Sequence, residues 1–284
     1  MKASEASPAP TPDAAWRRLH EEATAPAAAV PPTADAAWHR LHDEATAPYR
    51  QGGRFAWHFA RGKLGRDPVF RSLIERGLIG AQRARVVDIG SGQSLIASLL
   101  SVAAAMQAQG RWPTRWTPTP PRVDYTGIEL MPKDVARAQA SLAHLRPPPR
   151  VVCADMCAAE LPACDLVVIL DVLHYVDPAA QAGVLRRVRD ALAPGGRLLL
   201  RIGDASSARG FAVSQWVDRT VTRVRGHRVS PTWGRTLPEW KALLAGLGFT
   251  VQSVPMSEGT PFANVLLVAD LPATAHGASA PRPT

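Results

Sequence analysis

The stretch Val86-Val87-Asp88-Ile89-Gly90-Ser91-Gly92-Gln93-Ser94 joins an apolar strand ending in an acid to a Gly-x-Gly turn and the start of a helix. Glycines let the backbone approach a ligand closely, and doubly wound sheets bind their ligands at the carboxyl ends of the strands. The dinucleotide fingerprint G-x-G-x-x-G would need a glycine at position 95, where this sequence has Leu95. The stretch therefore predicts a ligand site at the end of the first strand, but not one of the dinucleotide type.

Apolar strands and amphipathic helices alternate beyond residue 81. We expect strands at 84–89, 123–129, 150–154, 165–170, 197–202, 248–254 and 262–269, and helices near 94–107, 132–144, 178–193 and 237–246. The helix at 178–193 should stop at Pro194-Gly195-Gly196, a strong breaker that turns the chain into the next strand. Such alternation is typical of an α/β fold with a parallel sheet covered on both faces.

Further acids stand at the ends of the next three strands. Glu129, followed by Leu130, suits the paired hydroxyls of a ribose, because a carboxylate accepts both hydrogen bonds. Asp155 could accept a hydrogen bond from an adenine amino group while Met156 lies against the ring, and Asp171 ends the fourth strand. Each acid alone could be an ordinary cap, but an acid at four successive strand ends is a much rarer arrangement.

These motifs resemble those of class I S-adenosylmethionine-dependent methyltransferases, over about residues 49–269. VVDIGSG is similar to the family's first motif, with Ser94 in place of its third glycine, and ALAPGGRLLLR is similar to its helix-to-fifth-strand segment. MSEGTPFANVLLVA fits the family's antiparallel seventh strand. The resemblance implies a doubly wound, seven-stranded, mostly parallel sheet (the Rossmann-like methyltransferase fold) with an N-terminal helical lid, and S-adenosyl-L-methionine as cofactor.

The resemblance also assigns roles to the residues of the motifs. It implies cofactor contacts from Gly90 and Gly92 beneath the cofactor, Asp88 at its methionine end, Glu129 and Leu130 at the ribose, Asp155 and Met156 at the adenine, and Asp171 at the junction with the acceptor. Tyr49, Arg61 and Lys63 in the N-terminal helices could reach the cofactor's carboxylate, or could be ordinary solvated helix residues.

His174 is the candidate catalytic residue. An oxygen or phenol-activated carbon acceptor must lose a proton during methyl transfer, and imidazole titrates near neutral pH. His174 follows the fourth strand and is expected to face the cleft, although it could instead be a structural histidine of a loop.

The chain divides into four expected parts. Residues 1–34 are a disordered Ala/Pro-rich tail, 35–80 form the lid helices, 81–270 the methyltransferase domain with an insertion at 204–236, and 271–284 a second disordered tail. The first tail contains DAAWRRLHEEATAP at 13–26, which returns as DAAWHRLHDEATAP at 35–48, identical at 12 of 14 positions. We interpret the second copy as the one that docks on the domain, and the first as a spare.

Composition narrows the class of protein further. The net charge is +9, but the basic residues are scattered, so we expect no nucleic-acid partner. The three cysteines, spaced C-x3-C-x6-C, match neither a disulfide framework nor a zinc site, so no metal is expected. The longest apolar run, about 95–106, is too short to span a bilayer, which takes about 20 residues. We therefore expect a cytoplasmic protein.

The acceptor is expected to be a small molecule. The insertion carries an apolar stripe (Val213, Trp216, Val217 and Val224) beside several arginines, which suits an aromatic or acyl substrate bearing an acid or tethered to an acidic carrier protein. An amphipathic helix packed on the sheet edge would give the same pattern. The sequence DVLH at 171–174 resembles enzymes acting on quinone precursors and polyketides, and the run from YRQGG onward resembles methyltransferases of bacterial aryl polyene pathways, which implies secondary metabolism.

Three alternatives remain open. The chain could bind S-adenosylmethionine without catalysis, as a partner or regulatory subunit. It could be an RNA methyltransferase, although the Asn/Asp-Pro-Pro-Tyr/Phe motif of amino-directed nucleic-acid enzymes is absent after the fourth strand. A nicotinamide oxidoreductase is disfavoured by Leu95 and by the paired final strands.

Overall fold

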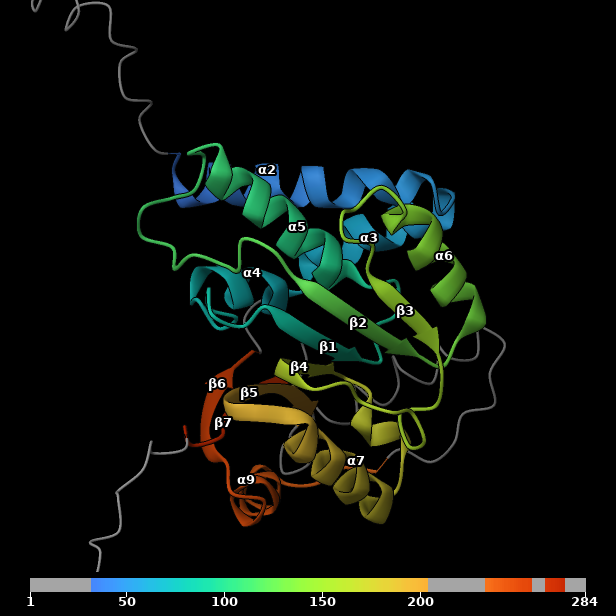
Figure 1. Cartoon of the computed structure of the whole chain (residues 1–284), viewed down its shortest axis with the longest axis vertical. Helices are drawn as coiled ribbons and strands as arrows, with labels where there is room; N and C mark the ends of the chain where they lie inside the picture. The colour runs from blue at the N-terminus through green and yellow to red at the C-terminus, as the bar shows by residue number, and fades with distance from the viewer. Residues whose placement is uncertain (1–31, 204–232, 257–263, 274–284) are drawn as a thin grey trace, which may run out of the picture.

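Seven strands form one sheet at the centre of the computed structural model, which describes residues 32–203, 233–256 and 264–273 (Figure 1). They are β1 (Arg85–Ile89), β2 (Asp124–Glu129), β3 (Arg150–Cys153), β4 (Cys164–Leu170), β5 (Leu192–Gly203), β6 (Thr250–Pro255) and β7 (Asn264–Asp270). Their order is β3-β2-β1-β4-β5-β7-β6, with β7 antiparallel to both of its neighbours and the other pairs parallel. This confirms the predicted sheet, including its antiparallel seventh strand.

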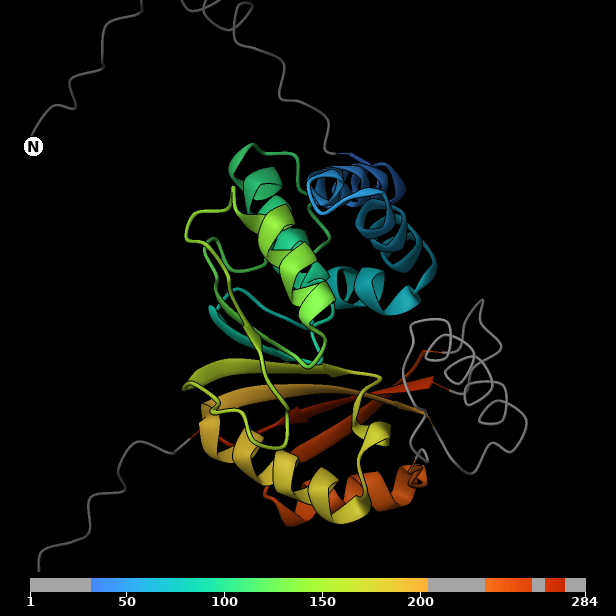
Figure 2. The ribbon, with the colours of Figure 1, turned by 90° about the vertical axis from the view of Figure 1, so that its right-hand side faces the viewer.

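Helices cover both faces of the sheet (Figure 2). One face carries α2 (Ala34–Thr46), α3 (Arg54–Arg66), α4 (Pro68–Glu75), α5 (Leu95–Ala108) and α6 (Pro132–Leu142), and the other carries α7 (Pro178–Ala191) and α9 (Leu237–Gly246). Two short 3-10 turns, η1 (Ala47–Arg50) and η2 (Leu173–Tyr175), join these elements. Successive strand residues face opposite cores, since Val86 packs with α2–α5 and Val87 with α7 and α9.

The N-terminal helices belong to the main core. Thr33 caps α2 by accepting a hydrogen bond from the N–H of Ala36, and α2 buries Trp38 and Leu41. Tyr49, in η1, is fully buried as well. The second copy of the repeat therefore docks as the sequence suggested, whereas the first copy lies outside the described residues. Closure of these helices over a ligand stays a prediction.

The start of β5 differs from the sequence-based expectation. Pairing begins at Leu192 beside Cys164 and resumes with Arg197 beside Leu166, so Pro194-Gly195-Gly196 lies within the strand as an irregularity. The helix before it ends at Ala191, two residues earlier than predicted. A shift in strand register accommodates the breaker residues without ending the strand. Of the predicted insertion, residues 204–232, with the apolar stripe and its arginines, lie outside the described residues.

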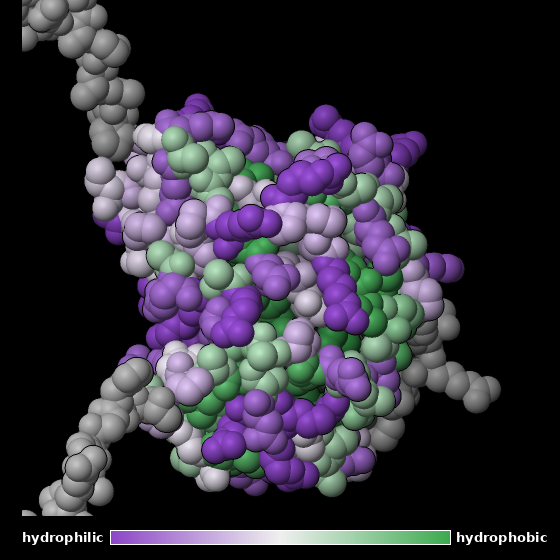
Figure 3. Space-filling model, viewed as in Figure 1, coloured by the Kyte–Doolittle hydropathy of each residue, from purple (hydrophilic) through white to green (hydrophobic). Residues whose placement is uncertain are grey.

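Polar side chains cover much of the face seen in Figure 3, with apolar residues showing between them. In the described part of the chain, no helix combines the length and apolar character that crossing a membrane requires.

Candidate functional site

The glycine turn after β1 lies across the end of β2. The N–H of Gly90 donates to the carbonyl oxygen of Ile128 at 2.8 Å. Gly90 has a φ of +71°, and a Cβ there would stand 2.3 Å from a methyl carbon of Val172, so position 90 requires glycine. Gly92 has a φ of +55°, but a Cβ there would meet no atom within 4 Å. The backbone at Gly92 therefore borders open space that a ligand can occupy.

Ser94 stands where the family motif has its third glycine. Its φ of +56° lies in the left-handed region, and its N–H donates to the carbonyl oxygen of Ser91 at 2.7 Å. A Cβ on Gly127, in the neighbouring strand, would lie 2.9 Å from Ser94 Oγ. The turn thus keeps a glycine-like backbone at Ser94, and Gly127 makes room for the serine side chain.

Glu129 connects the end of β2 to the glycine turn. Its Oε2 accepts from the N–H of Gly92 at 2.7 Å, and its Oε1 accepts from the N–H of Met131 at 2.9 Å. An ionised carboxylate has about four acceptor positions, so each oxygen keeps capacity for a ligand hydroxyl. Leu130, the next residue, is an exposed apolar side chain with 62% of its surface accessible. A carboxylate and an apolar platform therefore stand side by side next to Gly92.

Asp88 lies beneath the turn and not on its open side. It is buried, and its Oδ2 accepts a 2.6 Å hydrogen bond from the hydroxyl of Tyr125. Burial, with a smaller contribution from the charge of Glu129, raises the pKa of Asp88 to about 7, although the Tyr125 hydrogen bond acts in the opposite direction. In the structure, Asp88 thus supports the turn from within the core.

The predicted adenine motif follows β3. Asp155 is exposed, and its Oδ1 accepts from the N–H of Cys157 at 2.8 Å. Met156 is half-buried against the core on the α7 side, and its carbonyl oxygen accepts from Arg187. Because β3 lies next to β2 in the sheet, this segment and Glu129 end neighbouring strands.

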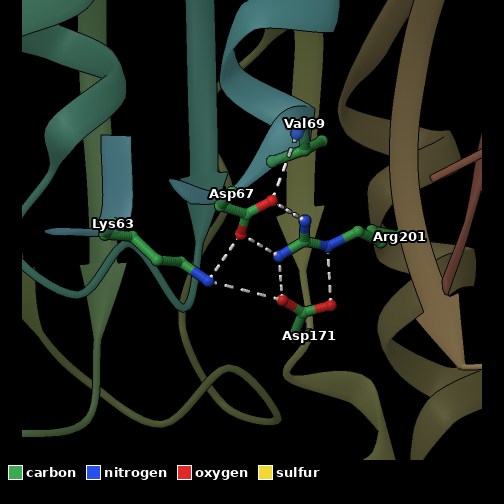
Figure 4. A network of polar contacts seen from close by, with 5 residues as sticks. All are labelled: Lys63, Asp67, Val69, Asp171 and Arg201. Carbon is green, nitrogen blue, oxygen red and sulfur yellow. Dashed lines mark hydrogen bonds and ion pairs between the residues drawn. The ribbon is translucent and has the colours of Figure 1, made fainter. Parts of the chain in front are cut away.

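Asp171 belongs to a network of four charged side chains (Figure 4). Arg201, on β5, donates from Nε and Nη2 to the two carboxylate oxygens of Asp171, and from Nη1 and Nη2 to those of Asp67. Lys63 Nζ lies 2.8 Å from Asp67 Oδ2 and 3.8 Å from Asp171 Oδ2. Asp67 also caps α4 by accepting from the N–H of Val69 at 3.1 Å. The network joins α3 and α4 to the ends of β4 and β5.

Electrostatics in this network favour the ionised forms. Burial alone would raise the pKa of Asp67, but the hydrogen bonds and positive charges of Arg201 and Lys63 outweigh it and hold that pKa well below its usual range. For Asp171, the same two cations outweigh burial and lower the pKa. Burial opposes the charge of Arg201, but the two carboxylates raise its pKa. Both oxygens of Asp171 are therefore engaged by protein in this state.

His174 lies in η2, three residues after Asp171. Its side chain is half-buried with the Nε2 atom buried, and its ring stands 4.1 Å from that of Tyr175 between centroids. Its carbonyl oxygen accepts from the N–H of Trp233 at 2.8 Å. Asp171, Val172 and His174 thus form one short segment, and Val172 packs over Gly90.

The three residues proposed for the cofactor's carboxylate are engaged elsewhere. Tyr49 donates its hydroxyl hydrogen to the carbonyl oxygen of Gln93 at 2.9 Å, inside the core. Arg61 pairs with Asp43 at 2.9 Å, and Lys63 is part of the network described above. Tyr49 therefore stabilises the glycine turn from below, a role that sequence reasoning did not assign.

Sequence reasoning also missed Tyr125 and Arg201. One signal was available for Arg201, because a charged residue in the otherwise apolar run Leu198-Leu199-Leu200-Arg201-Ile202 needs a buried partner. Tyr125 gave no comparable signal, since aromatic residues are common in strands.

The cysteines form no disulfide: Cys153 and Cys157 are exposed and free, and Cys164 is buried, which raises the pKa of its thiol to about 12. Within the described ranges, no group of three or more His, Cys, Asp or Glu side chains is arranged to hold a metal ion.

Comparison with known families matches residues 87–198 to a model described as a methyltransferase domain. This segment of the chain is thus similar to a methyltransferase domain. The matched segment runs from β1 into β5 and includes the glycine turn, Glu129, Asp155 and the 171–174 segment. It therefore includes His174 and the cofactor residues predicted at the strand ends, but not Tyr49, Arg61 and Lys63.

Curated relatives match over less than half of the chain. Carboxy-S-adenosyl-L-methionine synthase of Aeromonas hydrophila is 32% identical over 120 residues, which is 42% of this chain and 43% of the relative. Acetylserotonin O-methyltransferase of Mus musculus is 36% identical over 142 residues, 44% of this chain and 34% of the relative. The chain thus spans less than half the length of these two curated relatives.

Solved structures share the fold. The S-adenosylmethionine-dependent methyltransferase SibL, in its apo form, aligns with a TM-score of 0.53 and 21% identity, over 77% of this chain and 57% of that one. Magnesium protoporphyrin IX methyltransferase of Synechocystis PCC 6803, with bound SAH, aligns with a TM-score of 0.50 and 17% identity, over 83% of this chain and 93% of that one.

Proposed function

We propose that the chain binds S-adenosylmethionine beside the glycine turn and transfers its methyl group to a small-molecule acceptor. The observation that carries the proposal is the pairing of Glu129 with Gly92: a carboxylate with spare acceptor capacity is hydrogen-bonded to a glycine whose Cβ position is open. The match of residues 87–198 to a methyltransferase domain supports the same function.

The described residues suit this cofactor. Glu129 would accept hydrogen bonds from the two ribose hydroxyls beside exposed Leu130, and Asp155 and Met156 would contact the adenine. The open backbone at Gly92 would let the cofactor lie close to the turn. Asp88 has little exposed surface, so it would support the site indirectly, through its hydrogen bond to Tyr125 on the buried side of the glycine turn.

The cofactor, when bound, supplies an activated methyl group attached to a positively charged sulfur. The chain's own residues then have to orient the acceptor and exclude water. We assign His174 the removal of a proton from an acceptor hydroxyl or activated carbon. Asp171, held by Arg201, would fix the segment that presents His174.

More specifically, we propose that the acceptor is an aromatic or polyketide-like molecule. The mouse relative is by name an O-methyltransferase of acetylserotonin, which supports an oxygen atom on a small aromatic molecule as the target. The same proposal includes a carrier-tethered substrate, on the apolar stripe and arginines of the insertion, and a place in secondary metabolism such as aryl polyene formation, on the sequence resemblance. It also includes a cytoplasmic location, on the composition of the chain.

Calorimetric titration tests the cofactor assignment. S-adenosylmethionine and S-adenosylhomocysteine should bind the purified chain, while NADH should give no heat. Binding of NADH alone would overturn the proposal.

Incubation with labelled S-adenosylmethionine and extracts of the source organism, followed by mass spectrometry, tests the reaction. A methylated small molecule together with S-adenosylhomocysteine would identify the acceptor. Label in RNA would instead favour the RNA methyltransferase alternative, and cofactor binding without turnover in any extract would favour a non-catalytic partner. A carboxylated cofactor would point to the reaction named for the Aeromonas relative.

A further inference from the structure

The helix α2 is formed by the second of two near-identical segments, and the first segment preserves everything that α2 buries. The buried residues of α2 are Ala37, Trp38, Leu41, Ala45 and Thr46. Their counterparts 22 positions earlier are identical: Ala15, Trp16, Leu19, Ala23 and Thr24. The copies differ only at His39, which replaces Arg17, and at Asp43, which replaces Glu21, and both residues are exposed on α2.

Most residues that make the polar contacts of α2 have identical counterparts in the first segment as well. Thr33, which caps α2, corresponds to Thr11, and Pro12 corresponds to Ala34, the first residue of α2, a position at which helices favour proline. The residues of α2 that contact Arg71, Arg111 and the carbonyl oxygen of Arg61 are Asp35, Glu44 and His42, and their counterparts are Asp13, Glu22 and His20.

One contact of the surface that receives α2 involves a residue that differs: Arg61, on α3, pairs with Asp43 at 2.9 Å, and the counterpart of Asp43 is Glu21, which is also an acid. Helix α2 packs against α5 and α3. Ser98, on α5, donates its hydroxyl hydrogen to the carbonyl oxygen of Ala45 at 2.7 Å, a backbone contact that any residue at this position supplies. Leu41 and Ala45 have no exposed surface, so the side chains that fill this surface are ones that are identical in the two copies.

We infer that the surface formed by α3 and α5 accepts either copy, and that residues 13–26 replace α2 in the same chain when the second copy is weakened. Tyr49 follows both copies in the sequence. In the exchanged arrangement residues between the first copy and Tyr49 form a loop, and Tyr49 keeps its hydrogen bond to Gln93. Closing that loop costs entropy, which rises slowly with length and explains why the second copy is the resident one.

Thermal unfolding of four full-length chains tests the exchange: the wild type, Trp16→Ala/Leu19→Ala, Trp38→Ala/Leu41→Ala, and the quadruple variant. The first-copy variant should keep the wild-type Tm. The second-copy variant should unfold cooperatively with a moderately lower Tm. The Tm of the quadruple variant should decrease by much more than the sum of the two shifts in Tm, because neither copy can then dock. Equal Tm values for the second-copy and quadruple variants, or a second-copy variant that does not fold, would overturn the inference.

A matched control uses Leu73→Ala. Leu73 is fully buried in the same core but belongs to α4, outside the repeat. Its effect on Tm should be the same with and without Trp16→Ala/Leu19→Ala, and a difference would show that the first copy acts on the fold in some other way. The Tm of the second-copy variant should also be independent of protein concentration. A Tm that rises with concentration would place the first copy on a second molecule and contradict exchange within one chain.

Discussion

Arg201 donates two hydrogen bonds to the carboxylate of Asp171, a residue with a backbone φ of +59°. A non-glycine residue in this left-handed region is strained, by on the order of 1–3 kcal/mol, and persists only where its surroundings hold it. A bidentate guanidinium pair fixes both the position and the orientation of the carboxylate. Arg201 therefore fixes the start of the segment that carries Val172 over Gly90 and leads into His174.

Arg201→Met should destabilise the chain strongly. The substitution leaves the carboxylates of Asp67 and Asp171 without their main partner, and breaking a buried ion pair in this way costs about 3–5 kcal/mol. Urea unfolding measures the loss. Arg189→Met is the matched control, because Arg189 pairs with Asp190 on the exposed side of α7 and should change stability by about 0.5 kcal/mol or less. Similar losses in the two variants would contradict a structural role for the network.

Asp88→Asn should make the chain more stable above pH 7. The pKa of Asp88 is raised from 3.8 to about 7 in the folded state, so folding takes up a proton between these values and stability falls as the pH rises through them. Asparagine keeps an oxygen to accept the Tyr125 hydrogen bond but carries no buried charge. The gain at pH 8 should be on the order of 2–4 kcal/mol.

The control for this effect is its pH dependence. Thermal unfolding at pH 4 and pH 8 should show similar stabilities for Asp88→Asn and wild type at the lower pH and a clear gap at the higher one. Asp124→Asn, at the exposed start of β2, should show no such gap. An Asp88→Asn chain less stable than the wild type at pH 8 would mean that the ionised carboxylate stabilises the turn.

The sheet could be predicted from the sequence because its signals are local. Apolar runs such as Val86-Val87, followed by Gly90 and Gly92, mark where strands lie and end. The antiparallel seventh strand was expected from the family resemblance and not from these local signals. The predicted start of the fifth strand at residue 197 was wrong, since the strand begins at Leu192. A register shift in strand pairing depends on the neighbouring strand, which no local pattern records.

The contacts of the candidate site were harder to predict than its residues. Glu129 was identified from its position at a strand end, but its hydrogen bond to Gly92 joins positions 37 residues apart. The pairing of Arg201 with Asp67 spans 134 residues and depends on where α4 packs. Tyr49 was proposed as a ligand contact because its exposure could not be judged from the sequence, and the structure buries it completely. Tertiary packing, and not residue type, decided these cases.

Glu129→Ala should weaken binding of S-adenosylmethionine by about 1.5–3 kcal/mol, the range for losing hydrogen bonds to a charged group. The variant also frees the N–H of Gly92, so both the ribose contact and the geometry of the turn are affected. Asp155→Ala should have a smaller effect, because exposed Asp155 is proposed only for the adenine edge.

Calorimetric titration measures this loss of affinity. Asp124→Ala, at the opposite end of the same strand, serves as the control and should bind like the wild type. Unchanged affinity in Glu129→Ala would remove the ribose assignment and, with it, much of the argument for this cofactor.

His174→Ala addresses the proposed proton transfer. If His174 is the general base, the substitution should slow the chemical step by about 10²–10⁴-fold and leave cofactor affinity nearly unchanged. Because a phenolic acceptor that is already ionised needs no base, the residual rate should rise with pH. Single-turnover kinetics across a pH series, with the acceptor found by the labelling experiment, provide the measurement.

A structural role for His174 would give a different pattern. The His174 carbonyl oxygen accepts from Trp233 through the backbone, and this contact survives the substitution, so a loss of Tm would have to come from the ring and its packing near Tyr175. In that case cofactor binding and Tm would fall together, and the residual rate would keep the wild-type pH profile. Turnover within a few-fold of the wild type, with unchanged Tm, would mean that the acceptor needs no base. The enzyme would then act by positioning alone, and the segment fixed by Arg201 and Asp171 would contribute to catalysis only through the placement of the acceptor.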